Sequence, residues 1–232
     1  MSLILGFDTA TPDTAVATWS DGSSMERLLG PDENDRPVHG TQLLGAIEEV
    51  VEASGGWAEI GMIAVGLGPG SFTGLRIGIS TARALAQSRS LPIAGVPSTS
   101  ALLAGVSELP EAADRRRLAL IDARRGEVFA ALDSGSGPGE PVVSPPTEVA
   151  SALGLDTLSG TLAGGNGAVR FRSEIEAAGA VALPEGSDAN RLAASRICEL
   201  AATIEAGDPE SIRPLYLRRP DAERWRERSG SN

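Results

Sequence analysis

The stretch that decides the fold reads GMIAVGLGPGSFTGLRIGISTARALAQSR and spans residues 61–89. An apolar run at 62–65 enters a loop with glycines at positions 66, 68, 70 and 74. A helical pattern then begins near Ser71 or Thr73, either of which can cap a helix. The stretch therefore predicts a strand, a glycine-rich turn and a helix. Two interpretations stay open: a backbone site for an anion at the helix N-terminus, or a tight crossover without a ligand.

Several known kinds of catalytic or phosphate site are excluded by missing residues. The loop lacks Gly-Lys-Ser/Thr and departs from Gly-x-Gly-x-x-Gly at the third glycine. All 20 basic residues are arginine, which excludes a lysine nucleophile or base. His39 is the only histidine, so a His–His metal pair is impossible, and no Gly-x-Ser-x-Gly elbow accompanies it. We predict no catalytic and no metal-binding residue, and we expect His39 to flank a helix.

The composition limits the classes of protein to which the chain can belong. The chain has 232 residues, a net charge of −11 and one cysteine, Cys198, which excludes an internal disulfide and predicts a buried, inert thiol. No apolar run approaches the roughly 20 residues of a membrane span, and the first residues predict a strand instead of a signal peptide. A cytoplasmic location with no membrane contact is expected.

Basic residues are concentrated near the C-terminus. Residues 213–228 carry six arginines and three acidic residues, whereas the rest of the chain is strongly acidic. This basic tail can contact a phosphate backbone or an acidic partner, or it can be a solvated helical end.

The pattern of strands and helices is repeated along the chain. In the first half strands are predicted at 3–8, 14–19, 25–29 and 92–96, with Asp21-Gly22 as a hairpin turn, and helices at 41–54, 75–89 and 98–106, with Thr41 capping the first and Ser98 the last. In the second half strands are predicted at 117–122, 127–132, 140–143, 161–163 and 180–183, with a turn at 123–126, and helices at 147–153, 168–178 and 189–206. Each half opens on a strand that ends in an aspartate, Asp8 or Asp122. This predicts a duplicated α/β architecture. The expected divisions are 1–106 and 107–211, with the helix at 189–206 able to pack back across the lobes, and a tail at 212–232.

Four motifs carry a resemblance to a known family. They are Ile4-Leu5-Gly6-Phe7-Asp8-Thr9-Ala10-Thr11, the glycine-rich stretch at 66–78, the segment 121–128, and Pro214-x-Tyr216-Leu217-Arg218. In order and spacing they resemble the bacterial TsaB (YeaZ) family over nearly the whole chain.

The resemblance implies a fold, a function and partners. The fold is the actin-like (ASKHA, ribonuclease H-like) two-lobed fold. The function is that of a non-catalytic scaffold that dimerises with the catalytic paralogue TsaD, the two modifying the adenosine next to the tRNA anticodon to threonylcarbamoyladenosine. The resemblance also implies a TsaE-like ATPase partner, tRNA contact only through the complex, and no cofactor apart from ATP or ADP contact within the complex. Whether the free chain forms a homodimer stays open.

The residues present agree that the catalytic parts are missing. The paralogue binds its metal with a histidine pair in the segment corresponding to 95–101, where this chain has no histidine, so the glycoprotease-like metal site is absent. Asp8 and Asp122 stand where actin-like ATPases place acids, but no glycines follow Asp8 to wrap a phosphate. A vestigial phosphate site is predicted at Asp8, Thr9, Gly68, Gly70, Ser71 and Asp122. The alternative is an independent actin-like ATPase or kinase that uses Asp8 or Asp122.

The helices at 41–54 and 75–89 carry more apolar residues than one sheet can cover, so a partner surface is predicted there. The residues expected to bind the partner are Leu43, Leu44, Ile47, Val50, Val51, Arg76, Ile77 and Ala84. The alternative is that all of them are buried against the chain's own lobes.

Overall fold

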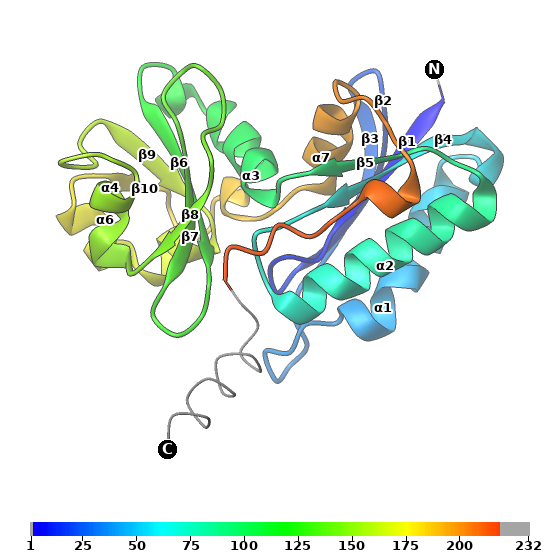
Figure 1. Cartoon of the computed structure of the whole chain (residues 1–232), viewed down its shortest axis with the longest axis horizontal. Helices are drawn as coiled ribbons and strands as arrows, with labels where there is room; N and C mark the ends of the chain where they lie inside the picture. The colour runs from blue at the N-terminus through cyan, green and yellow to red at the C-terminus, as the bar shows by residue number, and fades with distance from the viewer. Residues whose placement is uncertain (1, 219–232) are drawn as a thin grey trace.

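Two five-stranded sheets, one in each lobe, form the framework of residues 2–218, the part of the chain that the computed structural model describes (Figure 1). The first sheet has the order β3-β2-β1-β4-β5, and its strands are β1 (Leu3–Asp8), β2 (Thr14–Ser20), β3 (Ser23–Leu29), β4 (Ile60–Gly66) and β5 (Ile93–Val96). The second has the order β10-β9-β6-β7-β8, with β6 (Arg116–Asp122), β7 (Val128–Asp133), β8 (Val142–Ser144), β9 (Thr161–Gly164) and β10 (Val181–Ala182).

The two sheets repeat one topology. In the first, β1 runs antiparallel to β2 and parallel to β4; in the second, β6 runs antiparallel to β7 and parallel to β9. Read from the hairpin edge, each sheet has its third, second, first, fourth and fifth strands in that order. This repeat confirms the duplicated actin-like (ASKHA, ribonuclease H-like) two-lobed fold.

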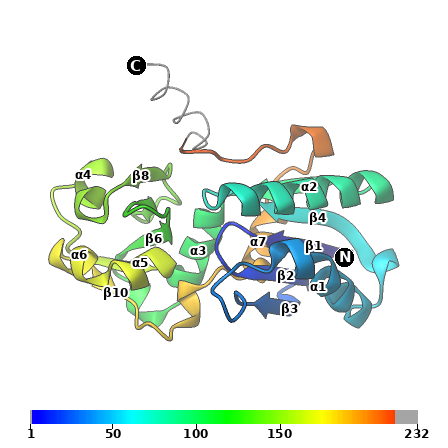
Figure 2. The ribbon, with the colours of Figure 1, turned by 90° about the horizontal axis from the view of Figure 1, so that it is seen from below.

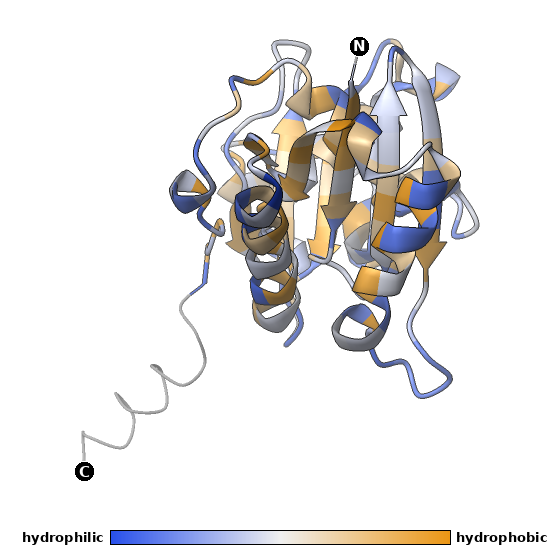
Figure 3. Cartoon of the chain, turned by 90° about the vertical axis from the view of Figure 1, so that its right-hand side faces the viewer, coloured by the Kyte–Doolittle hydropathy of each residue, from blue (hydrophilic) through white to orange (hydrophobic). Residues whose placement is uncertain are grey.

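Helices cover both faces of the first sheet. The helices of the chain are α1 (His39–Ala53), α2 (Phe72–Arg89), α3 (Ser98–Ser107), α4 (Val149–Ala152), α5 (Asn166–Arg170), α6 (Arg172–Ala177) and α7 (Ala194–Ala201). Successive residues of a strand point to opposite faces. Accordingly Leu5 and Phe7 of β1 join a core with α1 and α2, whereas Ile4 joins a core with α7. In Figure 3 the strands at the centre of the view carry most of the hydrophobic colour.

The two lobes share part of their core. One cluster of buried side chains includes Leu102 of α3, Ile197 of α7, and Ala119 and Ile121 of β6. Helix α3 therefore lies between the lobes and packs on elements of both (Figure 1). This shared core joins the lobes on one side.

Two local signals in the sequence are confirmed. Asp21 and Gly22 both have positive φ, 48° and 82°, as the hairpin turn between β2 and β3 requires. Ser71 is the N-cap of α2, and its hydroxyl oxygen accepts a hydrogen bond from the Gly74 amide at 3.2 Å.

Two expected helix caps are wrong. Thr41 lies inside the first turn of α1, and its hydroxyl donates to the Val38 carbonyl instead of accepting from an amide. Ser98 begins α3, but its side chain is used in a contact with Asp8. Both residues are good caps in isolation, and in each case a neighbouring group takes up the hydroxyl.

The predicted helices in the second half are too long. The one at 168–178 is interrupted at Phe171, which separates α5 from α6. The long helix at 189–206 is reduced to α7, because Asn190 binds the Pro184 carbonyl and the Gly165 amide and holds the preceding segment out of a helix. Glu26 of β3 then accepts from the Ala194 amide at 2.5 Å and fixes where α7 begins.

Three further expectations concern a membrane span, the division into lobes and the basic tail. Among residues 2–218, no helix combines the length and the apolar character that crossing a membrane requires. The division at 106/107 and 211/212 stays a prediction, and α7 packs on β1, β2 and α3. Of the basic tail, Arg219, Arg224, Arg226 and Arg228 lie outside the described residues.

Candidate functional site

The glycine-rich loop after β4 packs tightly on the loop that follows β1. The hydroxyl of Thr9 donates to the Gly74 carbonyl at 2.8 Å, and the Ser71 amide donates to the Ala10 carbonyl at 2.8 Å. A Cβ at Gly74 would lie 2.0 Å from the backbone carbonyl oxygen of Thr9, and one at Gly70 would lie 2.4 Å from the backbone carbonyl oxygen of Ala10. These glycines are required by a contact inside the chain. The tight crossover accounts for Gly70 and Gly74, and the anion site at the helix N-terminus stays a prediction.

Asp8, at the end of β1, is enclosed in the first lobe. Its side chain accepts hydrogen bonds from the Ala10 amide at 2.6 Å and from the Ser98 hydroxyl at 2.5 Å, and only 1% of the residue is exposed. Ser98 in turn accepts from the Gly68 amide at 3.1 Å. Burial raises the pKa of Asp8, and the two hydrogen bonds partly oppose that rise. The carboxyl group is therefore held by its own lobe.

Asp122, the second aspartate of the repeat, is paired with arginines. Its Oδ2 lies 2.9 Å from Nη1 of Arg170 and 3.8 Å from Nη1 of Arg124, and its Oδ1 accepts from the Arg124 amide at 2.8 Å. The Asp122 amide donates to the Asn166 side chain. Two guanidinium groups thus neutralise this carboxylate.

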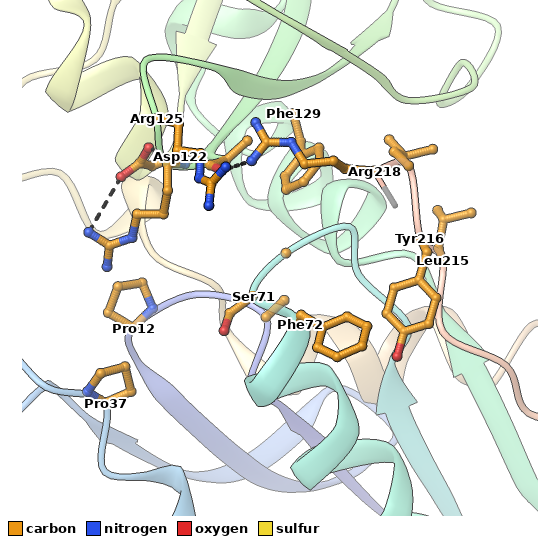
Figure 4. A pocket seen from close by; sticks show the side chains of 15 residues that line it. Pro12, Pro37, Ser71, Phe72, Asp122, Arg125, Phe129, Leu215, Tyr216 and Arg218 are labelled. Carbon is orange, nitrogen blue, oxygen red and sulfur yellow. Dashed lines mark hydrogen bonds and ion pairs between the residues drawn. The ribbon is translucent and has the colours of Figure 1, made fainter. Parts of the chain in front are cut away.

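A pocket lies between the lobes (Figure 4). Its volume is about 220 Å³. Ser71 and Phe72 stand on one side, Asp122 and Arg125 on the opposite side, and Tyr216 beside Phe72 (Figure 4). The residues lining it are Ala10, Pro12, Pro37, Gly70, Ser71, Phe72, Asp122, Ala123, Arg124, Arg125, Phe129, Leu215, Tyr216, Leu217 and Arg218.

The pocket brings together half of the predicted phosphate site. Gly70, Ser71 and Asp122 line it. The other three predicted residues, Asp8, Thr9 and Gly68, do not, and Asp8 and Thr9 are buried in the first lobe. Within residues 2–218, no three His, Cys, Asp or Glu side chains are grouped as metal ligands would be.

Sequence reasoning missed one wall of the pocket. The sequence predicts a basic tail at 212–232, yet residues 215–218 line the cavity, and the Tyr216 ring lies 5.0 Å from that of Phe72. The motif Pro214-x-Tyr216-Leu217-Arg218 was the available signal. The turn after β6 lies at 123–126 as predicted, but the sequence did not indicate the left-handed backbone of Arg124 and Arg125, whose φ of 61° and 57° are uncommon for residues of their type.

The predicted partner surface is smaller than expected. Four of its residues are buried in the core between the first sheet and its helices, so they cannot contact a partner: Leu43, Ile47, Val50 and Val51. That part of the prediction is wrong, because β2, β3 and α2 pack against α1. Leu44 is 63% exposed, Arg76 and Ala84 are exposed, and Ile77 is half-buried. We call these four residues the α1–α2 face.

His39 and Cys198 lie in the interior. His39 is the first residue of α1, and its Nδ1 lies 2.7 Å from the Thr14 hydroxyl oxygen. Burial lowers the pKa of His39. Burial also raises the pKa of Cys198, which lies between α7 and the first sheet, so that its thiol stays protonated.

Comparison with known proteins gives one family model and several sequence relatives. Residues 33–137 match the family model described as TsaD, tRNA N6-adenosine threonylcarbamoyltransferase. The chain is 40% identical over 128 residues to the tRNA threonylcarbamoyladenosine biosynthesis protein TsaB of Escherichia coli, an alignment that covers 54% of this chain and 52% of that protein. The chain thus spans about half the length of the first curated relatives that it matches.

Matches over the whole length are also found. The uncharacterized protein Rv3421c of Mycobacterium tuberculosis is 30% identical over 225 residues, covering 96% of this chain and 94% of that protein. Among solved structures, YeaZ from Pseudomonas aeruginosa superposes with a TM-score of 0.76 at 27% identity, covering 94% of this chain and 100% of that chain.

Proposed function

The chain belongs to the TsaB (YeaZ) family, and we propose that it takes part in threonylcarbamoyladenosine biosynthesis in tRNA as a non-catalytic subunit that dimerises with a TsaD-like paralogue. In this proposal the paralogue carries the catalysis. A TsaE-like ATPase joins the complex. The chain contacts tRNA, and ATP or ADP, only as part of that complex.

The exposed side chain of Leu44 is the observation that carries the dimerisation. A leucine that is 63% exposed in the middle of a helix has no partner within residues 2–218 that covers it. Two small residues of the same helices, Gly45 of α1 and Ala84 of α2, are also exposed, and small residues allow a helix of another chain to approach closely. A helical partner surface fits this arrangement.

Charge separates the two helices of the α1–α2 face. Helix α1 exposes Glu48, Glu49 and Glu52, whereas the first turns of α2 expose Arg76. A partner with the opposite order of charges is favoured, and association should weaken as salt is raised.

Two contacts support the non-catalytic role. Asp8 is hydrogen-bonded to Ser98 inside the first lobe, and Asp122 is paired with Arg170 and Arg124. Neither carboxylate is available as a general base or metal anchor without rearrangement. The second candidate, an independent ATPase or kinase, would be favoured by magnesium-dependent ATP turnover of the isolated chain that Asp8→Asn abolishes.

The test of dimerisation uses the full chain and its paralogue. We expect Leu44→Glu with Ala84→Glu to abolish co-elution on size exclusion and to leave the melting temperature close to that of the wild type. The matched control is Val181→Glu, which alters an apolar residue that is 48% exposed on the second lobe and should leave co-elution intact. If the double variant still co-elutes, the α1–α2 face is not the interface.

A further inference from the structure

We propose that residues 207–218 form a strap that holds the two lobes at a set separation, and that Arg76 connects this strap to the α1–α2 face. The strap runs beside α2 and then crosses toward the second lobe, as Figures 1 and 2 both show. Only the connection to the α1–α2 face rests on the proposed function. The strap itself is a property of the free chain.

The strap is fixed to the first lobe at its start. Gly207 and Ile93 of β5 exchange two backbone hydrogen bonds, of 2.9 and 3.3 Å. Ile212 is buried in the core beneath α2, and the Leu215 amide donates to the Leu67 carbonyl at 2.8 Å. These contacts span most of the strap, so its first nine residues belong to the first lobe.

The strap is fixed to the second lobe at its end. Nη1 of Arg218 donates to the Ala123 carbonyl at 3.1 Å, and Arg218 forms an ion pair with Glu127. Both partners lie in the turn between β6 and β7. The side chains of Arg218 and Glu127 are 17% and 34% exposed, so solvent screens this pair less than an exposed one. Arg218 therefore joins the strap to the second lobe.

The strap and two other contacts join the lobes, and Leu217 of the strap packs against the core that the lobes share. On the α3 side, the lobes share a core. On another side, Arg191 forms a bidentate pair with Asp13, with distances of 2.7 and 2.8 Å. Between these joins lies the pocket, and residues 215–218 form one of its walls. Without the Arg218 contacts this wall would keep the packing of Leu217 against the shared core but lose its hydrogen bond and ion pair to the second lobe, which would loosen the separation of the lobes.

Arg76 touches the strap from the α1–α2 face. Its Cζ lies 3.9 Å from the centre of the Phe72 ring, and its Nε donates to the Tyr216 hydroxyl at 3.4 Å. The rings of Phe72 and Tyr216 are tilted by 31° at 5.0 Å. An acidic group of a partner that pairs with Arg76 competes for the same guanidinium. Binding at the α1–α2 face would then loosen Tyr216.

Hydrogen exchange of the full free chain tests the strap. We expect Arg218→Ala to speed amide exchange about tenfold in 213–218 and in 123–127, because it removes hydrogen bonds made by a charged group. The matched control is Arg213→Ala in the same segment, since among residues 2–218 Nη1 of Arg213 donates to the nearby Glu210 and Ile212 carbonyls, which belong to the strap itself. If Arg218→Ala gives the profile of the wild type or of Arg213→Ala, the strap is overturned.

Pulsed electron paramagnetic resonance measures the separation of the lobes directly. Nitroxide labels at Glu33→Cys and Ser136→Cys, two exposed sites on different lobes, report the distance, and Cys198 is buried and does not compete for the label. Adding Arg218→Ala should broaden the distance distribution. An unchanged distribution would show that the strap does not set the separation.

The role of Arg76 is tested separately. In the free chain, Arg76→Ala and Tyr216→Phe should each speed exchange in 213–218. In the complex with the paralogue, wild-type exchange in the same segment should rise. A complex that forms without that rise overturns the connection, whereas failure to form a complex counts against the proposed function and leaves the free-chain result intact.

Discussion

The hydroxyl of Ser98 donates a 2.5 Å hydrogen bond to Oδ2 of Asp8, although the two residues are 90 positions apart in the chain. Ser98 begins α3 and Asp8 ends β1, so the bond joins the helix between the lobes to the central strand of the first sheet. The same serine accepts from the Gly68 amide and so fixes the glycine-rich loop. A carboxyl group in the position of a catalytic acid thus serves the packing of three segments.

Asp8→Asn should change how stability depends on pH. Burial raises the pKa of Asp8 above its ordinary value of 3.8, so its stabilising contribution is present at low pH and is lost as pH rises through the raised pKa. The free energy of unfolding of the variant, relative to the wild type, should therefore increase with pH from 3.5 upward. Urea denaturation at several pH values measures it, with Asp21→Asn, in the exposed hairpin turn, as control.

Gly74→Ala should destabilise the chain by about 2–4 kcal/mol, because the added Cβ would lie 2.0 Å from the Thr9 oxygen. Gly45→Ala is the control: its Cβ meets no atom within 4 Å in the middle of α1, and the variant should gain about 0.5–1 kcal/mol. Chemical denaturation of the three proteins gives both values. Equal stability of the two variants would contradict the close approach.

The wild type should lose stability in mild acid because of His39, and we expect His39→Asn to abolish that loss. Burial lowers the pKa of His39, while the Thr11 backbone and the charge of Asp13 partly oppose the change. The histidine must stay neutral in the fold, so stability falls as pH decreases through the ordinary histidine value of 6.5 toward the lowered pKa. Melting temperatures from pH 8 to pH 5 measure this. The result is simple to assign because the chain has one histidine.

Arg76→Ala should cost only about 0.5–1 kcal/mol of stability, the value of a cation–π contact at an exposed site, and should lower tRNA modification by the reconstituted complex. Arg89→Ala is the matched control, since Arg89 stacks on Trp57 at 3.6 Å at the other end of α2. Melting and modification assays on both variants separate stacking from function. Equal loss of activity in the two would remove the special role of Arg76.

The fold was largely predictable because its signals are local. The Asp21–Gly22 turn and the Ser71 cap depend on residues within a few positions, and both are as predicted. The helix at 189–206 was not, because its true start depends on Glu26 and Asn190, whose partners lie far away in the chain. The partner surface was only partly predictable, since apolar periodicity does not tell which of Leu43 and Leu44 the sheet covers.

By itself the sequence determined the duplicated strand and helix order and the family, because periodicity and motif spacing are written along the chain. The tertiary structure decided what the residues of those motifs do. A glycine permits the close approach of a ligand or of another segment of the chain. At Gly74 the approaching group is the backbone carbonyl oxygen of Thr9, a residue 65 positions away in the sequence. An aspartate at a strand end can serve a metal or a neighbouring side chain, and Asp8 faces Ser98. Only the fold brings these partners together, and so only the fold assigns the role.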